Sequence, residues 1–143
     1  MIKNENTIIT VRTTVNAPLK KVWKHWTSPD SITGWNFASD DWHSPRAEND
    51  LRKDGKFNYR MEAKDGSMGF DFTGTYDEVE EGEKISYTIG DGRKVEIIFS
   101  SYDNKTEIIE SFEAESQNPV ELQRNGWQSI LNNFKKFAES ADN

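Results

Sequence analysis

The chain has 143 residues, of which 34% are hydrophobic and 12% aromatic, and its formal net charge is −7. This length suits one domain with a sizeable core, expected to span residues 1–143. The acidic balance, with no stripe of Lys or Arg, disfavours nucleic acid as a partner, and the absence of cysteine excludes disulfides, a thiolate nucleophile and a cysteine metal site.

Membrane and export signals are also missing from the sequence. No run approaches the roughly 18 apolar residues that a spanning helix needs, and residues 1–6 lack the apolar stretch of a signal peptide. We therefore expect a cytoplasmic protein without a membrane span.

The first predicted elements are a strand and two short helices. Between Ile9 and Val15, apolar residues and threonine alternate with polar residues, which indicates a strand with one buried face. Asn16 is placed to cap the following helix, in which His25 falls off the apolar stripe and is expected to be exposed. That stripe comprises Leu19, Val22, Trp23 and Trp26. A second short helix is expected over residues 29–34.

Six further strands follow, separated by turn sequences such as Asp65-Gly66 and Asp103-Asn104. Aromatic and apolar residues recur at every second position between Phe57 and Tyr76, so one face of the sheet must be covered. The short spacing of the turns indicates an antiparallel meander. The predicted strands are 42–49, 55–63, 67–79, 84–89, 93–101 and 105–112.

A long helix that begins around Pro119 can cover this face. Asn118 is placed to cap it, and Glu121 has the spacing of a capping box. Its buried stripe is expected to contain Val120, Trp127, Ile130, Leu131, Phe134 and Phe137. The fold class is therefore α+β, with a curved antiparallel sheet of six or seven strands wrapped around the C-terminal helix and two short helices after the first strand.

Short sequence words support this architecture and add a family resemblance. They are Ala17-Pro18 with Val22-Trp23 and Trp26, Pro29-Asp30 with Gly34-Trp35, Asp50-Leu51-Arg52 with Gly55-Lys56-Phe57, Gly74-Thr75-Tyr76, Lys105-Thr106, and Gly126-Trp127. Their order over about 130 residues resembles the START-related (SRPBCC) superfamily with a helix-grip fold, in the branch similar to the heat-shock ATPase activator. Members of this branch commonly have Gly-Gly where this chain has Asp54-Gly55, so one glycine must make the turn, and Asp tolerates the left-handed conformation.

The resemblance implies a cavity for hydrophobic small molecules between the sheet and the terminal helix. Aromatic and apolar side chains on the predicted inward faces are the candidate ligand-binding residues. They are Trp35, Trp42, Tyr59, Met61, Phe70, Phe72, Tyr87, Phe99, Phe112, Trp127, Ile130 and Phe134. The alternative is that these rings interdigitate as an ordinary core.

Two residues are candidates for acid–base chemistry. Glu110 shares the strand parity of Ile108 and Phe112, so it can point inward, where burial would raise its pKa and let it transfer protons or pair with a cationic ligand. The alternative is that Ile109 points inward and Glu110 is solvated. His43, at the start of the second predicted strand, is the other candidate, although a surface or structural role is the simpler interpretation. No metal site or cofactor is predicted.

Three functions remain open. The leading hypothesis is a binding module, monomeric or weakly dimeric, whose cavity takes a lipophilic or aromatic small molecule. The second is an enzyme of the cyclase or dehydratase kind, acting on a polyketide-like substrate in the cavity. The third, which the resemblance implies, is a protein-interaction domain that stimulates a chaperone ATPase.

Overall fold

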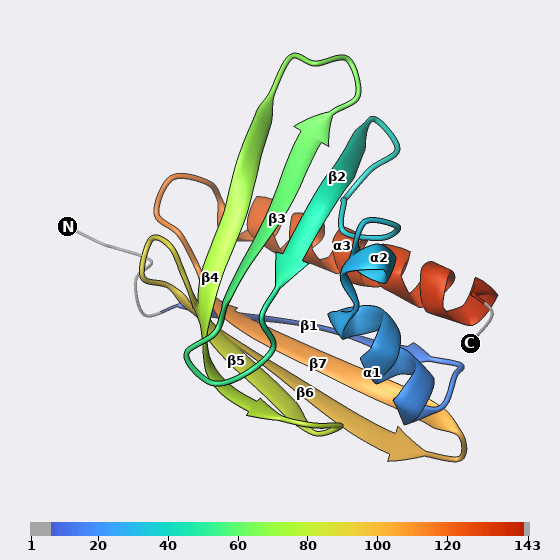
Figure 1. Ribbon diagram of the computed structural model, residues 1–143. Helices are drawn as coiled ribbons and strands as arrows, with labels where there is room; N and C mark the ends of the chain where they lie inside the picture. Colours follow the sequence, from blue (N-terminus) through green and yellow to red (C-terminus); the bar gives the residue numbers. More distant parts are fainter. Residues whose placement is uncertain (1–6, 142–143) are drawn as a thin grey trace.

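The computed structural model describes residues 7–141, which form a curled antiparallel sheet and helices on its concave side (Figure 1). The α+β prediction is confirmed, and the strand boundaries differ from the predicted ones by at most two residues. In chain order the elements are β1 (Ile8–Val15), α1 (Leu19–Thr27), α2 (Pro29–Ile32), β2 (Trp42–Asn49), β3 (Lys56–Ala63), β4 (Gly69–Glu80), β5 (Lys84–Ile89), β6 (Lys94–Tyr102), β7 (Lys105–Glu113) and α3 (Val120–Ser140).

The strand order is β1-β7-β6-β5-β4-β3-β2, all antiparallel neighbours. Strands β2 to β7 form the predicted meander, in which each strand pairs with the next along the chain. β1 instead pairs with β7, with Val15 opposite Thr106 and Ile8 opposite Glu113. The first and last strands therefore meet, and β1 and β2 form the two edges. Pro45 lies where the β2–β3 register shifts, as expected for proline on an edge strand.

The tight turns have the chemistry that the sequence predicted. Asp103 and Asn104 have φ values of 50° and 62°, the left-handed pair that joins two strands through a two-residue hairpin loop. Asp54 has a φ of 68°, so this aspartate does take the left-handed conformation before Gly55.

α3 crosses the concave face of the sheet and lies against β1 (Figure 1). Leu131, Phe134 and Ala138 on its inner side are fully buried. α1 contacts α3, β6 and β7, and α2 contacts β2, so the two short helices cover the remaining part of the core. Because the helices lie on one face only, every strand has one face toward the core and one toward water.

Three local predictions are wrong. Neither α1 nor α3 has a side-chain N-cap: Pro18 and Pro119 occupy those positions, the backbone N–H of Asn16 donates to Glu139, and Asn118 bonds to Glu115. His25 is buried, because α1 is covered by α3 as well as by the sheet, which widens its inner face. Its Nδ1 lies 2.9 Å from the Ser31 Oγ, and burial lowers its pKa.

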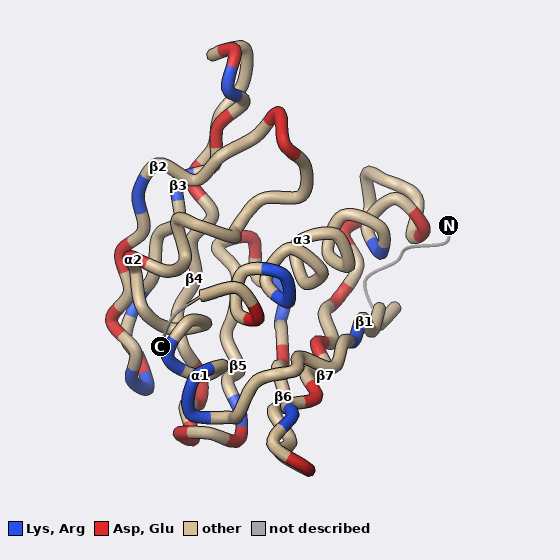
Figure 2. Tube along the Cα trace, turned by 90° about the vertical axis from the view of Figure 1, so that its right-hand side faces the viewer, with Lys and Arg blue, Asp and Glu red and all other residues tan. Residues whose placement is uncertain are grey.

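Acidic and basic residues are both spread along the described part of the chain (Figure 2). Figure 2 shows basic and acidic positions interspersed along the described trace, with no continuous basic stripe. None of the described helices is long and apolar enough to cross a membrane. Residues 1–6 and 142–143 lie outside the described part. The expectation that the chain lacks a signal peptide concerns residues 1–6.

Candidate ligand cavity

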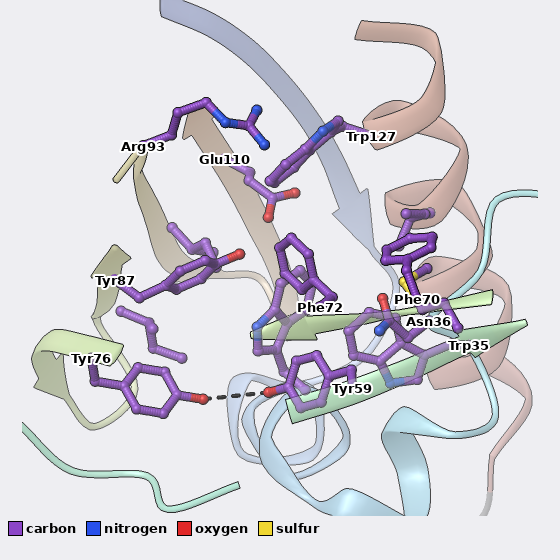
Figure 3. A pocket seen from close by; sticks show the side chains of 15 residues that line it. Trp35, Asn36, Tyr59, Phe70, Phe72, Tyr76, Tyr87, Arg93, Glu110 and Trp127 are labelled. Atoms are coloured by element: carbon purple, nitrogen blue, oxygen red, sulfur yellow. Dashed lines mark hydrogen bonds between the residues drawn. The ribbon is translucent and has the colours of Figure 1, made fainter. Parts of the chain in front are cut away.

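A cavity of about 280 Å³ lies between the concave face of the sheet and the helices (Figure 3). Side chains from five strands, from α1 and α3 and from two connecting segments form its wall. They are Trp26, Trp35, Asn36, Tyr59, Met61, Phe70, Phe72, Tyr76, Ile85, Tyr87, Arg93, Ile97, Glu110, Trp127 and Ile130. Phe70 is 46% exposed although it lines the cavity, so the cavity reaches the surface at the start of β4.

Aromatic rings held by a second layer of rings make up most of the wall. Trp127 on α3 meets the ring of Phe72 edge-on at 6.2 Å, and its other side is stacked on Phe112 at 3.9 Å. Trp26, Trp35 and Phe134 all contact one another, with ring centroids 4.8–4.9 Å apart. Such contacts between rings fix orientation, so the wall is preorganised.

Tyrosine hydroxyls supply polar atoms at one end of the cavity. The side-chain NH₂ group of Asn49 donates to the Thr27 carbonyl. Its Oδ1 accepts a 2.6 Å hydrogen bond from the Tyr76 hydroxyl. The Tyr59 hydroxyl lies 3.4 Å from the Tyr76 oxygen and, because the Tyr76 proton is already engaged, must be the donor (Figure 3). The Tyr59 oxygen is thus left with lone pairs that can accept from a ligand.

The tyrosines remain neutral at physiological pH. Burial raises the pKa of Tyr76 to about 12 and raises the pKa values of Tyr59 and Tyr87 well above their usual range. None of the three can therefore act as a phenolate in the empty cavity.

Glu110 is the one carboxyl group in the cavity wall. The parity of β7 places Ile108, Glu110 and Phe112 inward, so the alternative in which Ile109 takes the inward position is wrong. Glu110 is 6% exposed, and within residues 7–141 it makes no ion pair and accepts no hydrogen bond from another side chain. Burial raises its pKa from 4.5 to about 8, so the carboxyl is largely protonated at neutral pH.

Arg93 is the cationic residue of the wall, and its guanidinium is already engaged. Its Nε donates to Asp91 at 2.9 Å, and its Nη1 donates to the Glu113 carbonyl at 3.4 Å. No salt bridge joins Arg93 to Glu110. The side chain therefore closes the β5–β6 end of the cavity without neutralising the acid.

The structure brings most of the predicted ligand-binding residues to one wall. Those that line the cavity are Trp35, Tyr59, Met61, Phe70, Phe72, Tyr87, Trp127 and Ile130, together with Glu110. Phe99, Phe112 and Phe134 lie in the core layer behind the wall, and Trp42, which does not line the cavity, contacts Phe70 with ring centroids 6.0 Å apart. Alternation and helical spacing identify an inward face, but they do not distinguish the cavity surface from the layer beneath it.

His43 lies on the opposite side of the sheet from the cavity. Its side chain is 42% exposed, and its Nε2 is 3.7 Å from a carboxylate oxygen of Glu62, its partner across β2 and β3. Met61, the neighbour of Glu62, lines the cavity, so Glu62 and His43 must point outward. His43 is therefore not positioned to act on a molecule in the cavity.

Six wall residues were missing from the predicted set. Tyr76, Ile85 and Ile97 share the inward parity of their strands, and Trp26 belongs to the predicted stripe of α1, so a pattern existed for these four. Asn36 and Arg93 lie outside the regular elements, where no periodicity indicates direction. Within the described residues, no group of three or more His, Asp or Glu side chains could hold a metal ion.

Comparison with known proteins assigns the family. The family described as activator of Hsp90 ATPase homolog 1-like protein matches residues 16–139, and this chain belongs to it, within the SRPBCC superfamily. A solution structure of the AHSA1-like protein from Aeromonas hydrophila is 41% identical, with a TM-score of 0.89 over 94% of this chain and 93% of that one. A protein from Cytophaga hutchinsonii is 53% identical, with a TM-score of 0.80 over 95% of this chain and 92% of that one.

A more distant structure shows the same fold. The protein from Chromobacterium violaceum is 21% identical and has a TM-score of 0.83 over 94% of this chain and 98% of its own. No curated protein matches the chain. The family is compatible with a ligand-binding domain or with a domain similar to the Hsp90 ATPase activator.

Proposed function

We propose that this protein binds a small apolar or aromatic molecule in the cavity between the sheet and α3. The observation that carries the proposal is the cavity of about 280 Å³, whose wall is mostly aromatic and carries a few polar atoms. Small-molecule sites typically combine an apolar wall with a few polar groups, in volumes of ~300–1,000 Å³. The volume lies just below that range, which favours a ligand of one or two rings over a long-chain lipid.

Tryptophan fluorescence tests this proposal directly, because Trp127, Trp26 and Trp35 all line the cavity. Titration with neutral aromatic compounds of one or two rings should change the emission, and saturation at a hundredfold excess over Kd should stabilise the fold by about 2.7 kcal/mol. A broad panel that changes neither the emission nor the melting temperature would contradict the proposal.

A pair of variants locates the binding. Ile130→Trp places a larger side chain in the wall and should abolish the ligand-induced increase in melting temperature. Asn132→Trp adds the same side chain on the exposed face of α3 and should leave that increase unchanged. Equal responses from the two variants would mean that the ligand binds elsewhere.

The position of Glu110 favours a second candidate function, which is proton transfer to a substrate held in the cavity. An acid with a pKa of about 8 is protonated at neutral pH and can donate to a carbonyl or leaving oxygen, as a cyclase or dehydratase requires. Since His43 lies outside the cavity, Glu110 would have to act without it. Turnover of a polyketide-like substrate by the wild type, lost in Glu110→Gln, would support this candidate, and turnover that persists in Glu110→Gln would exclude Glu110 as the acid.

A further inference from the structure

We propose that the preferred ligand is an amine with an apolar body, bound with its ammonium group against Glu110 and its apolar part among the rings. This inference rests on the proposed function and specifies its ligand class. It follows from the geometry of Glu110, whose carboxyl group points into the space between Phe72, Tyr87 and Trp127 (Figure 3).

The Glu110 carboxyl is a buried acid without an ion-pair partner among residues 7–141. A buried charge is normally paired, because removing an unpaired carboxylate from water is costly. Glu110 is only 6% exposed, yet no basic side chain of the described residues lies within ion-pair distance of it. A cation that enters the cavity can supply the partner that these residues do not.

The surrounding rings are suited to a cation. Trp127 and Phe72 meet edge to face, as do Phe72 and Tyr87 at 6.4 Å, and all three rings lie around the carboxyl group of Glu110 (Figure 3). Ring faces attract ammonium groups, and desolvated sites of this kind contribute most. The lone pairs of the Tyr59 oxygen provide a further acceptor within the same cavity.

The other titratable groups that face the cavity do not supply a negative charge that could pair with an ammonium group. Tyr59 on β3, Tyr76 on β4 and Tyr87 on β5 are neutral phenols, and α3 contributes only Trp127 and Ile130. Arg93, at the β5–β6 turn, is held by Asp91 and by the Glu113 carbonyl, so its charge is partly compensated at the rim.

Binding of an ammonium group must be linked to proton release. The ammonium stabilises the carboxylate form of Glu110, so the protein loses the proton that it carries below about pH 8 when empty. A primary alkylamine stays charged throughout this range, because its pKa is near that of lysine, about 10.4. Amine affinity should therefore rise with pH by up to about tenfold per unit below pH 8 and level off above it.

Calorimetric titration with phenethylamine and with 2-phenylethanol, its neutral counterpart, tests the proposal at pH 6, 7 and 8. For the wild type we expect the Kd of the amine to fall at least about tenfold from pH 6 to pH 8, while that of the alcohol stays flat. Glu110→Gln should weaken amine binding at pH 8 at least about tenfold and remove its pH dependence. The alcohol should still bind this variant, which also shows that it is folded.

Glu107→Gln is the matched control, because it removes a carboxylate of the same strand that lies on the other face of the sheet. It should leave both ligands unaffected. Amine binding that is independent of pH, or equal in the wild type and Glu110→Gln, would overturn this inference while alcohol binding leaves the cavity proposal standing. If neither compound binds the wild type, this inference is wrong, and the broad panel of neutral compounds described above decides the cavity proposal.

Discussion

Glu110 imposes opposite requirements on stability and on binding. Its burial without a partner favours the protonated form and makes the folded state sensitive to pH, whereas an ammonium ligand requires the ionised form. A hydrophobic residue at this position would pack without making the stability of the folded state depend on pH. The proposed ammonium ligand would account for an acid at a position where it does not stabilise the fold.

The pH dependence of stability should report this acid. Its pKa is about 8 in the folded chain and about 4.5 in the unfolded one, so the folded state binds the proton more tightly. Its contribution is fully present below pH 4.5 and is lost as pH rises toward 8, by up to about 1.4 kcal/mol per unit. Glu110→Gln cannot ionise, so its free energy of unfolding relative to the wild type should increase by roughly 2–4 kcal/mol from pH 5 to pH 8.

Urea denaturation of both proteins at pH 5, 6.5 and 8 measures this difference. The comparison with the variant is necessary because His25 acts in the opposite direction: its pKa is lowered in the folded chain, so its contribution is lost as pH falls below 6.5. Glu107→Gln should follow the wild-type profile. A difference between Glu110→Gln and the wild type that does not change with pH would show that Glu110 titrates normally.

At the scale of the elements, the turn between β2 and β3 is the most constrained. Gly55 follows the left-handed Asp54, and a Cβ at Gly55 would lie 2.0 Å from the Asp50 carbonyl oxygen and 3.0 Å from that of Arg52. Both are backbone atoms, so neither can move aside without opening the turn. Gly55 therefore occupies a position where a side chain cannot fit.

Alanine substitutions at two glycines should give opposite results. Gly55→Ala should destabilise the fold by at least about 2–3 kcal/mol, because the turn must rearrange. Gly126→Ala, within α3, meets no atom within 4 Å and should stabilise by about 0.5–1 kcal/mol through helix propensity. Thermal denaturation followed by circular dichroism measures both. Destabilisation by Gly126→Ala would mean that α3 requires flexibility beside Trp127.

The helices and strands were largely predictable from the sequence, but the start of some helices was not. Alternation indicates strands because each residue faces either the core or water, and Asp-Asn and Asp-Gly turns mark where they stop. The predicted caps of α1 and α3 were wrong because both helices begin later than expected: Pro18 and Pro119 occupy the N-cap positions, so Asn16 and Asn118 lie before them. The backbone N–H groups of both asparagines bond to carboxylates, Glu139 and Glu115, and these contacts become visible only when the chain is folded.

For the whole molecule, the decisive contact is between the first and last strands. β1 pairs with β7 almost a hundred residues later, and this pairing adds the edge strand that lies against α3. At the end of the seam, the Thr106 hydroxyl donates to the Ala17 carbonyl at 2.9 Å in a fully buried position. That hydrogen bond joins the start of β7 to the segment that leads into α1.

Thr106→Val keeps the shape of the side chain but leaves the Ala17 carbonyl without this donor, so it should cost about 1–3 kcal/mol. Thr10→Val removes a hydroxyl from the same strand pair at an exposed position, where it bonds to Ser111, and should change stability by less than about 0.5 kcal/mol. Chemical denaturation distinguishes the two. Equal effects would show that the buried hydrogen bond does not hold the seam.

Residue spacing along the chain was sufficient for the α+β class, the meander and the long closing helix, because each depends on which face of one element is apolar. It left open whether Glu110 or Ile109 points inward, and the folded structure places Glu110 inward. The burial of each side chain, and its distance from residues remote in sequence, became known only from the folded structure. Only the packed chain separates Phe72 in the cavity wall from Phe112 beneath it, buries His25 under α3, turns His43 away from the cavity and brings Arg93 to its rim. Periodicity reports a direction within one segment, whereas a cavity is formed by distances between segments remote in sequence.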